Sequence, residues 1–447
     1  MAGRAEAWRY RALLHAFRLY DWVRRRFTPA GRLLLAAMLA SMALGFDTQQ
    51  SVAYQSFTFL AALLAACMLW ALAFRNRFEV GRTLPRFGTA GEPVSYTLRV
   101  TNLSLSPLAG LSVREEEGVL HPSFEEFAAA RPAEGSRAPL LARFAGFDRW
   151  QALRKARTLE GLEENALPML PPRGSAEVSG TLVPRRRGRL RFAGTAVARR
   201  DPLGVFRAFQ RQEAGQSMLV LPRRYPVPEL RLPGLRRYQQ GGIALTSAVG
   251  ESQEFMSMRD YRPGDPLRRI HWKSWAKAGK PIVKECQDEY FVRHALVLDT
   301  FAERGGPVFE EAVSVAASFA CSVLTQDSLL DILFVGAESY CFTVGRGLGG
   351  PDRVLEILAC AEPCAGKPFE VLRAGVARRR SVLSGCICVL LGCDESRQSL
   401  LRQLDAAGLP RVAFAVVEPG SQPELVPAGV RRLEAGRIAE GLCVPWA

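Results

Sequence analysis

Residues 250–285 of the chain read GESQEFMSMRDYRPGDPLRRIHWKSWAKAGKPIVKE. This stretch is dense in charged, aromatic and turn-forming residues, and its pattern predicts a loop followed by a helix. Asp265 is a good N-cap, and Pro266 suits the first helical position because its ring presets φ and it needs no backbone donor. The helix should run over residues 266–278, and Gly279 should end it in a left-handed conformation.

The predicted helix has two distinct faces. Its apolar stripe consists of Leu267, Ile270, Ser274 and Ala278. Basic residues recur every fourth position on another face, at Arg269, Lys273 and Lys277, and Trp272 and Trp275 lie at the margins. The segment before the helix carries charges of both signs, suited to pairing with the helix or with a partner.

The same stretch resembles the signature of a bacterial family named "domain of unknown function 58". The matching positions are Gly250, Glu254, Phe255, Met258, Arg259, Tyr261, Gly264, Asp265, Arg268, Ile270, Trp272 and Lys273. The spacing agrees without gaps from Glu254 onward, and only Gly250 is out of register, by two residues. The resemblance implies a C-terminal domain of the von Willebrand factor type A kind and an accessory role beside a MoxR-type AAA+ ATPase.

Length and composition limit the class of protein. A chain of 447 residues should form two or three domains. Its formal net charge of +15 suggests an anionic partner such as nucleic acid, lipid or an acidic protein surface, or else arginines that flank membrane spans. The ten cysteines lack the paired spacing of a structural zinc site, so we expect small buried side chains in a reducing compartment.

The N-terminal part predicts a membrane anchor. A basic segment, 1–29, precedes a two-span transmembrane hairpin predicted over 30–76, with apolar runs at 33–46 and 54–74. Arginines flank the pair on both outer ends, Arg82 among them. The positive-inside rule therefore places both termini in the cytoplasm, at the inner membrane.

The remainder divides into three parts. Alternating apolar and polar residues predict an antiparallel β-sandwich over 77–223, interrupted at 124–165 by a charged insertion with helical character that should be a surface excursion. A linker and the signature occupy 224–288. From 289 to 447, apolar strands alternate with amphipathic helices, which predicts a mainly parallel sheet covered by helices on both faces. The fold class is thus a membrane-anchored multidomain chain with a sandwich and an α/β domain.

The α/β domain has one candidate metal site. The resemblance to the von Willebrand type implies a divalent cation held at the carboxyl ends of the strands by an Asp-x-Ser-x-Ser motif and a later Asp. Asp299, Glu303 and Asp394 occupy the corresponding places, but Phe301 replaces the first serine. Mg²⁺ prefers such oxygen ligands, so it is the cofactor to consider, although the hydroxyl ligands are missing; no other cofactor is expected.

Signals of catalysis are absent from the sequence. It contains neither a G-x-x-x-x-G-K-[ST] phosphate loop nor a G-x-S-x-G nucleophile elbow. Of four histidines, only His271 lies within a motif, where a partner contact or a structural hydrogen bond is favoured over a general base. We therefore expect a protein that is not an enzyme.

The signature itself has three interpretations. In the clamp interpretation, Arg259, Asp260, Asp265 and Arg268 pair internally and Trp272 packs. In the docking interpretation, Arg269, Lys273 and Lys277 meet an acidic partner. In the third, which is disfavoured, the basic and aromatic residues bind nucleic acid.

The candidate site residues are Glu254, Phe255, Arg259, Asp260, Tyr261, Gly264, Asp265, Arg268, Arg269, His271, Trp272, Lys273 and Lys277. From them we expect a membrane-anchored scaffold or adaptor that assists a MoxR-type AAA+ ATPase in complex assembly or maturation. The alternatives are a membrane-anchored binder of nucleic acid or anionic lipid, and a divalent-cation-dependent interaction module.

Overall fold

A computed structural model shows the fold and divides the chain into two units, Met1–Leu221 and Pro222–Ala447. It describes residues 2–44, 52–72, 74, 78–116, 121–130, 146–157, 164–213, 215–227, 255–263, 265, 267, 270–286, 293–303, 305–323, 329–336, 338–345, 350–421 and 427–443.

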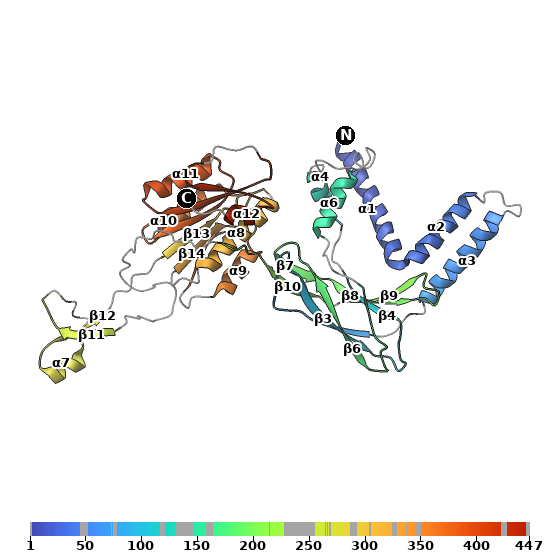
Figure 1. Ribbon diagram of the computed structural model, residues 1–447, viewed down its shortest axis with the longest axis horizontal. Helices are drawn as coiled ribbons and strands as arrows, with labels where there is room; N and C mark the ends of the chain where they lie inside the picture. The colour runs from blue at the N-terminus through green and yellow to red at the C-terminus, as the bar shows by residue number, and fades with distance from the viewer. Residues whose placement is uncertain are drawn as a thin grey trace. The chain divides into compact units, whose positions relative to one another are not determined.

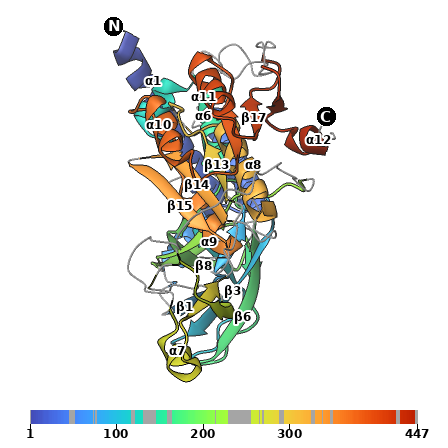
Figure 2. The same ribbon diagram turned by 90° about the vertical axis from the view of Figure 1, so that its left-hand side faces the viewer.

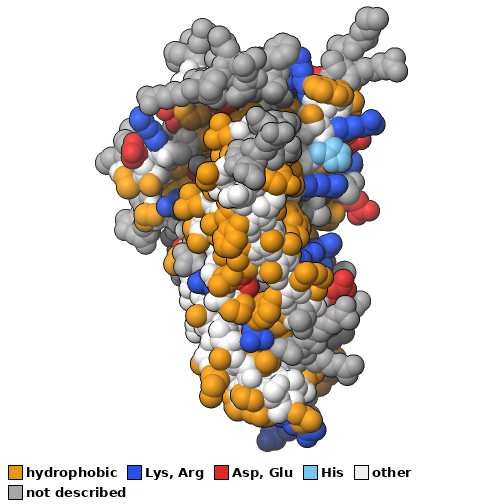
Figure 3. Space-filling view, turned by 90° about the vertical axis from the view of Figure 1, so that its right-hand side faces the viewer, with side chains coloured by type: hydrophobic (Ala, Val, Ile, Leu, Met, Phe, Trp, Pro, Cys, Tyr) orange, Lys and Arg blue, Asp and Glu red, His pale blue; other side chains and the backbone are white. Residues whose placement is uncertain are grey.

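Three helices open the first unit: α1 (Ala2–Arg26), α2 (Pro29–Leu44) and α3 (Val52–Leu72). The apolar helices α2 and α3 lie side by side, and apolar side chains gather on the face of the molecule where they lie (Figures 1 and 3). Within the described residues, α3 alone is long and apolar enough to cross a bilayer. The 16 residues of α2 extend about 24 Å, short of the roughly 30 Å hydrocarbon core. The finding is therefore one candidate membrane helix, where the sequence predicted two spans.

The first unit also contains three antiparallel or mixed sheets, ordered β1-β3-β6, β2-β10-β7 and β5-β4-β8-β9. Their strands are β1 (Phe78–Thr83), β2 (Phe87–Thr89), β3 (Val94–Asn102), β4 (Leu111–Glu116), β5 (Asn165–Ala166), β6 (Ser175–Leu182), β7 (Gly188–Phe192), β8 (Gly194–Arg200), β9 (Arg207–Gln212) and β10 (Gln216–Leu221). The predicted alternation holds in β3, where burial alternates strictly along the strand.

One apolar core joins the sheets to the membrane-type helices. Leu64, Cys67 and Ala71 of α3 are buried in the same cluster as strand residues such as Val113. At the α1–α2 junction the hydroxyl of Thr28 donates to the carbonyl of Gly204 at 2.6 Å. A Cβ atom at Gly31 would overlap the carbonyl oxygen of Val205, so a larger residue there would push α2 away from the sheet.

Arg82 is not one of the membrane-flanking surface charges that the sequence suggested. Its Nε donates to Glu115 at 2.7 Å and its Nη2 donates to Thr195 at 3.0 Å, and its guanidinium lies 4.6 Å from the ring centre of Phe192. The side chains of Arg82 and Glu115 are both 0% exposed. Strand alternation explains this, because Phe78, Val80 and Arg82 point to the same face of β1.

The 124–165 insertion is also more than a surface excursion. Its helices α4 (Phe124–Ala129) and α6 (Phe147–Arg157) pack on α1 around Phe17, Phe127 and Trp150. Phe127 and Trp150 are fully buried, and Trp150 stacks on Phe17 with ring centres 5.4 Å apart. An Arg154–Asp21 ion pair of 2.6 Å adds to the contact. The insertion therefore shares a core with the N-terminal segment.

The second unit contains a six-stranded sheet ordered β15-β14-β13-β16-β17-β18. Its strands are β13 (Arg293–Leu298), β14 (Leu329–Val335), β15 (Ser339–Val344), β16 (Gly385–Leu391), β17 (Arg411–Val417) and β18 (Val430–Glu434). Every neighbouring pair is parallel except β14–β15. Chain order reverses between β13 and β16, which makes their carboxyl ends the switch point of a doubly wound sheet, where ligands bind in such folds.

Helices cover both faces of this sheet, as predicted. They are α8 (Pro307–Val323), α9 (Pro351–Ala359), α10 (Glu370–Arg379), α11 (Glu395–Ala406) and α12 (Ile438–Cys443). Figures 1 and 2 show α8 and α9 on one face and α10 and α11 on the other. Cys386 and Cys388 of β16 are fully buried, and burial raises the pKa of the Cys386 thiol to about 12, so both behave as small apolar side chains.

Residues 255–286 form a two-stranded antiparallel sheet of β11 (Phe255–Asp260) and β12 (Ile282–Cys286), with a short helix, α7 (Trp272–Ala278), between the strands. We call this element the signature hairpin. Gly279 ends α7 at φ +67°, and its N–H donates to the carbonyl of Trp275, as predicted.

Candidate functional site

The predicted start of the signature helix is wrong. His271, not Asp265, is the residue before the first turn of α7. Ile270 bridges Val283 of β12 in antiparallel fashion, and the N–H of His271 donates to the carbonyl of Ile282 at 2.8 Å. Strand-like pairing at these two residues is incompatible with a continuous helix from Pro266.

Asp265 instead closes the loop of the signature hairpin. Its two carboxylate oxygens accept from Nη1 and Nη2 of Arg259 at 2.7 and 2.8 Å, and one also accepts from the backbone N–H of Arg262 at 2.9 Å. The bidentate bond from Arg259 lowers the pKa of Asp265 to about 2. Asp260 pairs with Lys280 at 2.7 Å. Three of the four residues of the clamp interpretation, Arg259, Asp260 and Asp265, thus form ion pairs within the hairpin, and Arg268 lies outside the described residues.

The outer face of α7 is basic and aromatic. Trp272 is 65% exposed and stacks on Trp275 with ring centres 5.1 Å apart, and Lys273 and Lys277 are exposed beside it. No acidic residue occurs between 266 and 284. His271 contacts the hydroxyl of Ser274 through Nδ1 at 2.6 Å.

Several predicted site residues cannot be placed. Glu254, Gly264, Arg268 and Arg269 lie outside the described residues, and of Phe255 only the backbone, in β11, is described. Tyr261 is half-buried and its N–H donates to the carbonyl of Pro281 at 2.9 Å.

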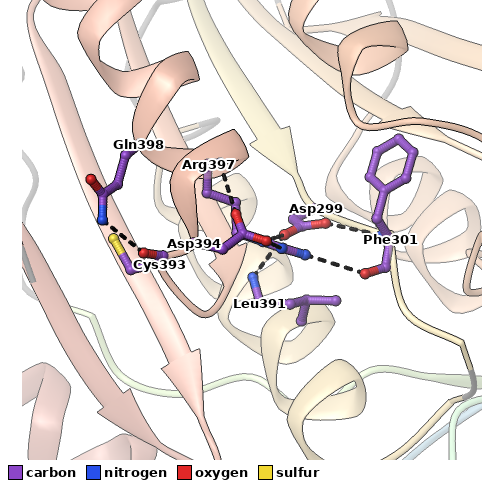
Figure 4. Close-up of polar contacts among 7 residues, drawn as sticks. All are labelled: Asp299, Phe301, Leu391, Cys393, Asp394, Arg397 and Gln398. Atoms are coloured by element: carbon purple, nitrogen blue, oxygen red, sulfur yellow. Dashed lines mark hydrogen bonds and ion pairs between the residues drawn. The ribbon is translucent and has the colours of Figure 1, made fainter. Parts of the chain in front are cut away.

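A second candidate site lies at the carboxyl ends of β13 and β16 (Figure 4). Asp299 follows β13 and is fully buried; its Oδ1 accepts from the N–H of Phe301 and its Oδ2 from the N–H of Leu391, both at 2.9 Å. Oδ2 also accepts from Nε of Arg397 at 2.6 Å. Asp394 caps α11, its Oδ1 accepting from the N–H of Arg397 at 2.9 Å, and its other oxygen pairs with the guanidinium. Arg397 thus joins the two aspartates.

The predicted metal ligands do not fit a divalent cation. Glu303 is exposed, and Phe301 offers no hydroxyl but packs its ring on Phe369 at 5.3 Å. Among the described parts of the chain, no group of three or more His, Cys, Asp or Glu side chains is placed to hold a metal ion. Although burial opposes it, pairing with Asp299 and Asp394 raises the pKa of Arg397, so the guanidinium stays charged.

A cavity of about 430 Å³ opens at the same edge of the sheet. Its walls are mostly apolar, including Phe301, Phe309 and Val416, and Glu418 and Arg432 contribute charge. Nη2 of Arg432 donates to the carbonyl of Ser421 at 2.7 Å. The carboxyl edge therefore combines an internally paired charge cluster with a space large enough for a side chain or small molecule.

Residues 257–419 match the family model described as "Protein of unknown function DUF58". The matched range is less than half of the chain and extends from the signature hairpin to the end of β17. The resemblance noted in the sequence is confirmed for this region.

Curated and solved proteins add little on function. The "Uncharacterized protein YeaD" of Bacillus subtilis is 28% identical over 189 residues, which cover 41% of this chain and 45% of that protein. The chain thus spans about half the length of that relative. The CARDB domain of PF1109 from Pyrococcus furiosus is 11% identical over 32% of this chain and 94% of that domain, with a TM-score of 0.18. A score that low supports no structural conclusion.

Within the DUF58-matching region, sequence reasoning missed Arg397 and Lys280. A signal for Arg397 was available, because a basic side chain in the first turn of a helix opposes the helix dipole unless a carboxylate lies nearby. Asp394, three residues before it, supplies that carboxylate. Lys280 gave no such signal, since its partner Asp260 is 20 residues away in the sequence.

Proposed function

We propose that this chain is a membrane-anchored, non-enzymatic adaptor that docks a MoxR-type AAA+ ATPase through the outer face of α7. In this proposal the ATPase acts in the assembly or maturation of a membrane-associated complex. The observation that supports it most is that the signature hairpin contains two separate sets of side chains, one paired internally and one exposed. Arg259, Asp260, Asp265 and Lys280 pair with one another, while Trp272, Lys273 and Lys277 face solvent.

The energetics of α7 fit a docking face. A seven-residue helix gains little stability from its own hydrogen bonds, so its position depends on the hairpin that carries it. Trp272 exposes a large apolar surface to water while it stacks on the half-buried Trp275, and tryptophans are enriched at the centres of protein interfaces. The neighbouring lysines would steer an acidic partner toward them.

The anchor and the α/β unit complete the proposal. We infer that α2 and α3 together form a two-span hairpin with both chain termini in the cytoplasm, and that the doubly wound sheet is of the von Willebrand factor type A kind. The apolar surface of α2 and α3 supports the first inference, with Leu33, Leu39 and Phe59 among its exposed residues. The strand order supports the second.

The experiment is a crosslinked pull-down from native membranes, comparing wild type with Lys273→Glu/Lys277→Glu. An Arg186→Glu/Arg378→Glu variant removes the same charge at two exposed positions outside the hairpin. We expect an AAA+ ATPase with wild type and the control, and its loss with the α7 variant. Recovery of the ATPase with all three proteins would show that α7 is not the docking surface.

A bilayer surface is the alternative that the tryptophan–lysine face also fits, because such side chains occur together at membrane interfaces. Wild type and the α7 variant would be reconstituted in vesicles, and the protection of α7 from protease would be compared with and without anionic lipid. Equal ATPase recovery combined with loss of this protection in the variant would favour the lipid function. Turnover of a substrate by purified protein would contradict the non-enzymatic proposal.

A further inference from the structure

The guanidinium of Arg397, which belongs to α11, lies at the carboxyl ends of β13 and β16. All described hydrogen bonds of the Arg397 guanidinium are directed to this edge: to Asp299, to Asp394 and, at 3.2 Å, to the carbonyl of Phe301. The arginine side chain is only 12% exposed, and its Cζ lies 5.5 Å from the ring centre of Phe369. Figure 4 shows Arg397 extending from α11 to lie between the two aspartates.

The carboxylate oxygens of Asp299 that could bind a cation already accept hydrogen bonds from the protein. Each Asp299 oxygen accepts a backbone N–H, and the second also accepts from Arg397. Mg²⁺ demands near-ideal octahedral coordination by oxygens, often including water. A cation at this edge would have to take the position that the guanidinium holds between the two aspartates, and neither Phe301 nor the exposed Glu303 adds a ligand.

We propose that the guanidinium of Arg397 takes the place of a divalent cation at this edge, so that the α/β unit holds the β13 and α11 ends together without metal. The planar guanidinium offers five directional N–H donors, enough to join a carboxylate on each side and a carbonyl in one arrangement. Any binding by this edge is therefore independent of divalent cations and insensitive to chelators.

The proposal explains why a basic residue is tolerated in the first turn of α11. Buried in low-dielectric surroundings, an unpaired arginine or an unpaired Asp299 would each be strongly destabilising. Paired, they connect the start of α11 to the end of β13, which are neighbours in the fold but 98 residues apart in the sequence. Asp299 also accepts the N–H of Leu391, so the pair positions that residue, which lines the adjacent cavity.

The test is Mn²⁺ binding to the purified full-length protein, measured by electron paramagnetic resonance and by calorimetry. Wild type, Arg397→Lys and Arg397→Ser are compared, with Arg402→Ser as the control. Arg402 lies on the same helix and pairs with Glu395 at an exposed position. Arg397→Lys keeps the charge, whereas Arg397→Ser removes it and adds a hydroxyl to the two freed carboxylates.

We expect no Mn²⁺ bound at this edge in wild type, Arg397→Lys or the control. Arg397→Ser should gain one site, with a dissociation constant of about 10⁻⁴–10⁻³ M, as in weak oxygen-ligand sites. Adding Asp299→Asn to Arg397→Ser should abolish the gained site. If Arg397→Ser does not fold, Arg397→Gln is measured instead, because its amide oxygen is itself a metal ligand.

Two results would overturn the proposal. One is a Mn²⁺ site in wild type that Asp299→Asn removes. The other is a folded Arg397→Ser or Arg397→Gln protein that binds no Mn²⁺, which would show that the guanidinium is not what excludes the cation. Neither result bears on the ATPase pull-down, so this inference and the proposed function fail separately.

Discussion

Replacing Arg82 by methionine should be among the most damaging single changes in the first unit. The substitution keeps an apolar stem of similar length but leaves the Glu115 carboxylate buried without its cation. The only described contact that remains to that carboxylate is the hydroxyl of Thr195 at 3.3 Å. Removing one partner of a buried ion pair costs about 3–5 kcal/mol, a large share of the roughly 5–15 kcal/mol that stabilises a typical domain.

The magnitude follows from burial, and a matched pair in the same unit tests that reasoning. Arg99 of β3 and Glu177 of β6 also pair across strands, but their side chains are 65% and 53% exposed. Arg99→Met should therefore cost no more than about 1 kcal/mol. The double variant Arg82→Met/Glu115→Leu removes both buried charges, so most of the single-variant loss should be recovered.

The assay is urea unfolding in detergent, followed by hydrogen exchange of the β1, β4 and β8 amides so that the unfolding of the first unit is reported separately from that of the α/β unit. If Arg82→Met costs as little as Arg99→Met, burial does not determine the strength of this pair. If the double variant is as unstable as the sum of its single variants, Arg82 and Glu115 do not depend on each other.

Three further outcomes are expected. Trp150→Ala should cost about 3–5 kcal/mol and expose α1 to protease, because the fully buried indole joins α6 to α1; an unchanged digestion pattern would contradict this. The signature hairpin should loosen as the pH falls from about 4 toward about 2, since the pKa of Asp265 is lowered in the fold from an ordinary value near 3.9; carboxyl NMR would follow this, and Arg259→Lys should raise the pKa. Burial lowers the pKa of His294, so its contribution to stability is complete above about pH 6.5 and is lost below it; the unfolding midpoint of His294→Gln should vary less between pH 7.5 and 5.5, and equal pH slopes would refute the assignment.

The order of strands and helices in the α/β unit could be predicted from the sequence because buried parallel strands form continuous apolar runs. The predicted alternation of apolar strands and amphipathic helices is present in this unit, for example where β16 (Gly385–Leu391) is followed by α11 (Glu395–Ala406). These elements have a strong local signal, since the hydrophobic period alone separates strand from helix.

The errors arose where tertiary contacts override local preference. Asp265 and Pro266 favour a helix start, yet pairing of Ile270 and His271 with β12 delays α7 until Trp272. Such pairing is set by residues ten or more positions away, which no local pattern reports. The prediction that Arg82 is a membrane-flanking surface charge was wrong for a different reason. It rested on the short distance in sequence between Arg82 and the apolar helices. The alternation along β1 instead places Arg82 on the buried face of the strand.

The core that α3 shares with the sheets of the first unit has a mechanical consequence. Cys67 and Ala71 are buried in the same cluster as strand side chains, and Gly31 lies against Val205, so α2 and α3 both contact the sheets directly. A bilayer that becomes thinner makes a spanning helix tilt. If α3 crosses the bilayer as proposed, such a tilt must rotate the sheets packed on it, so the orientation of these sheets would change with membrane thickness.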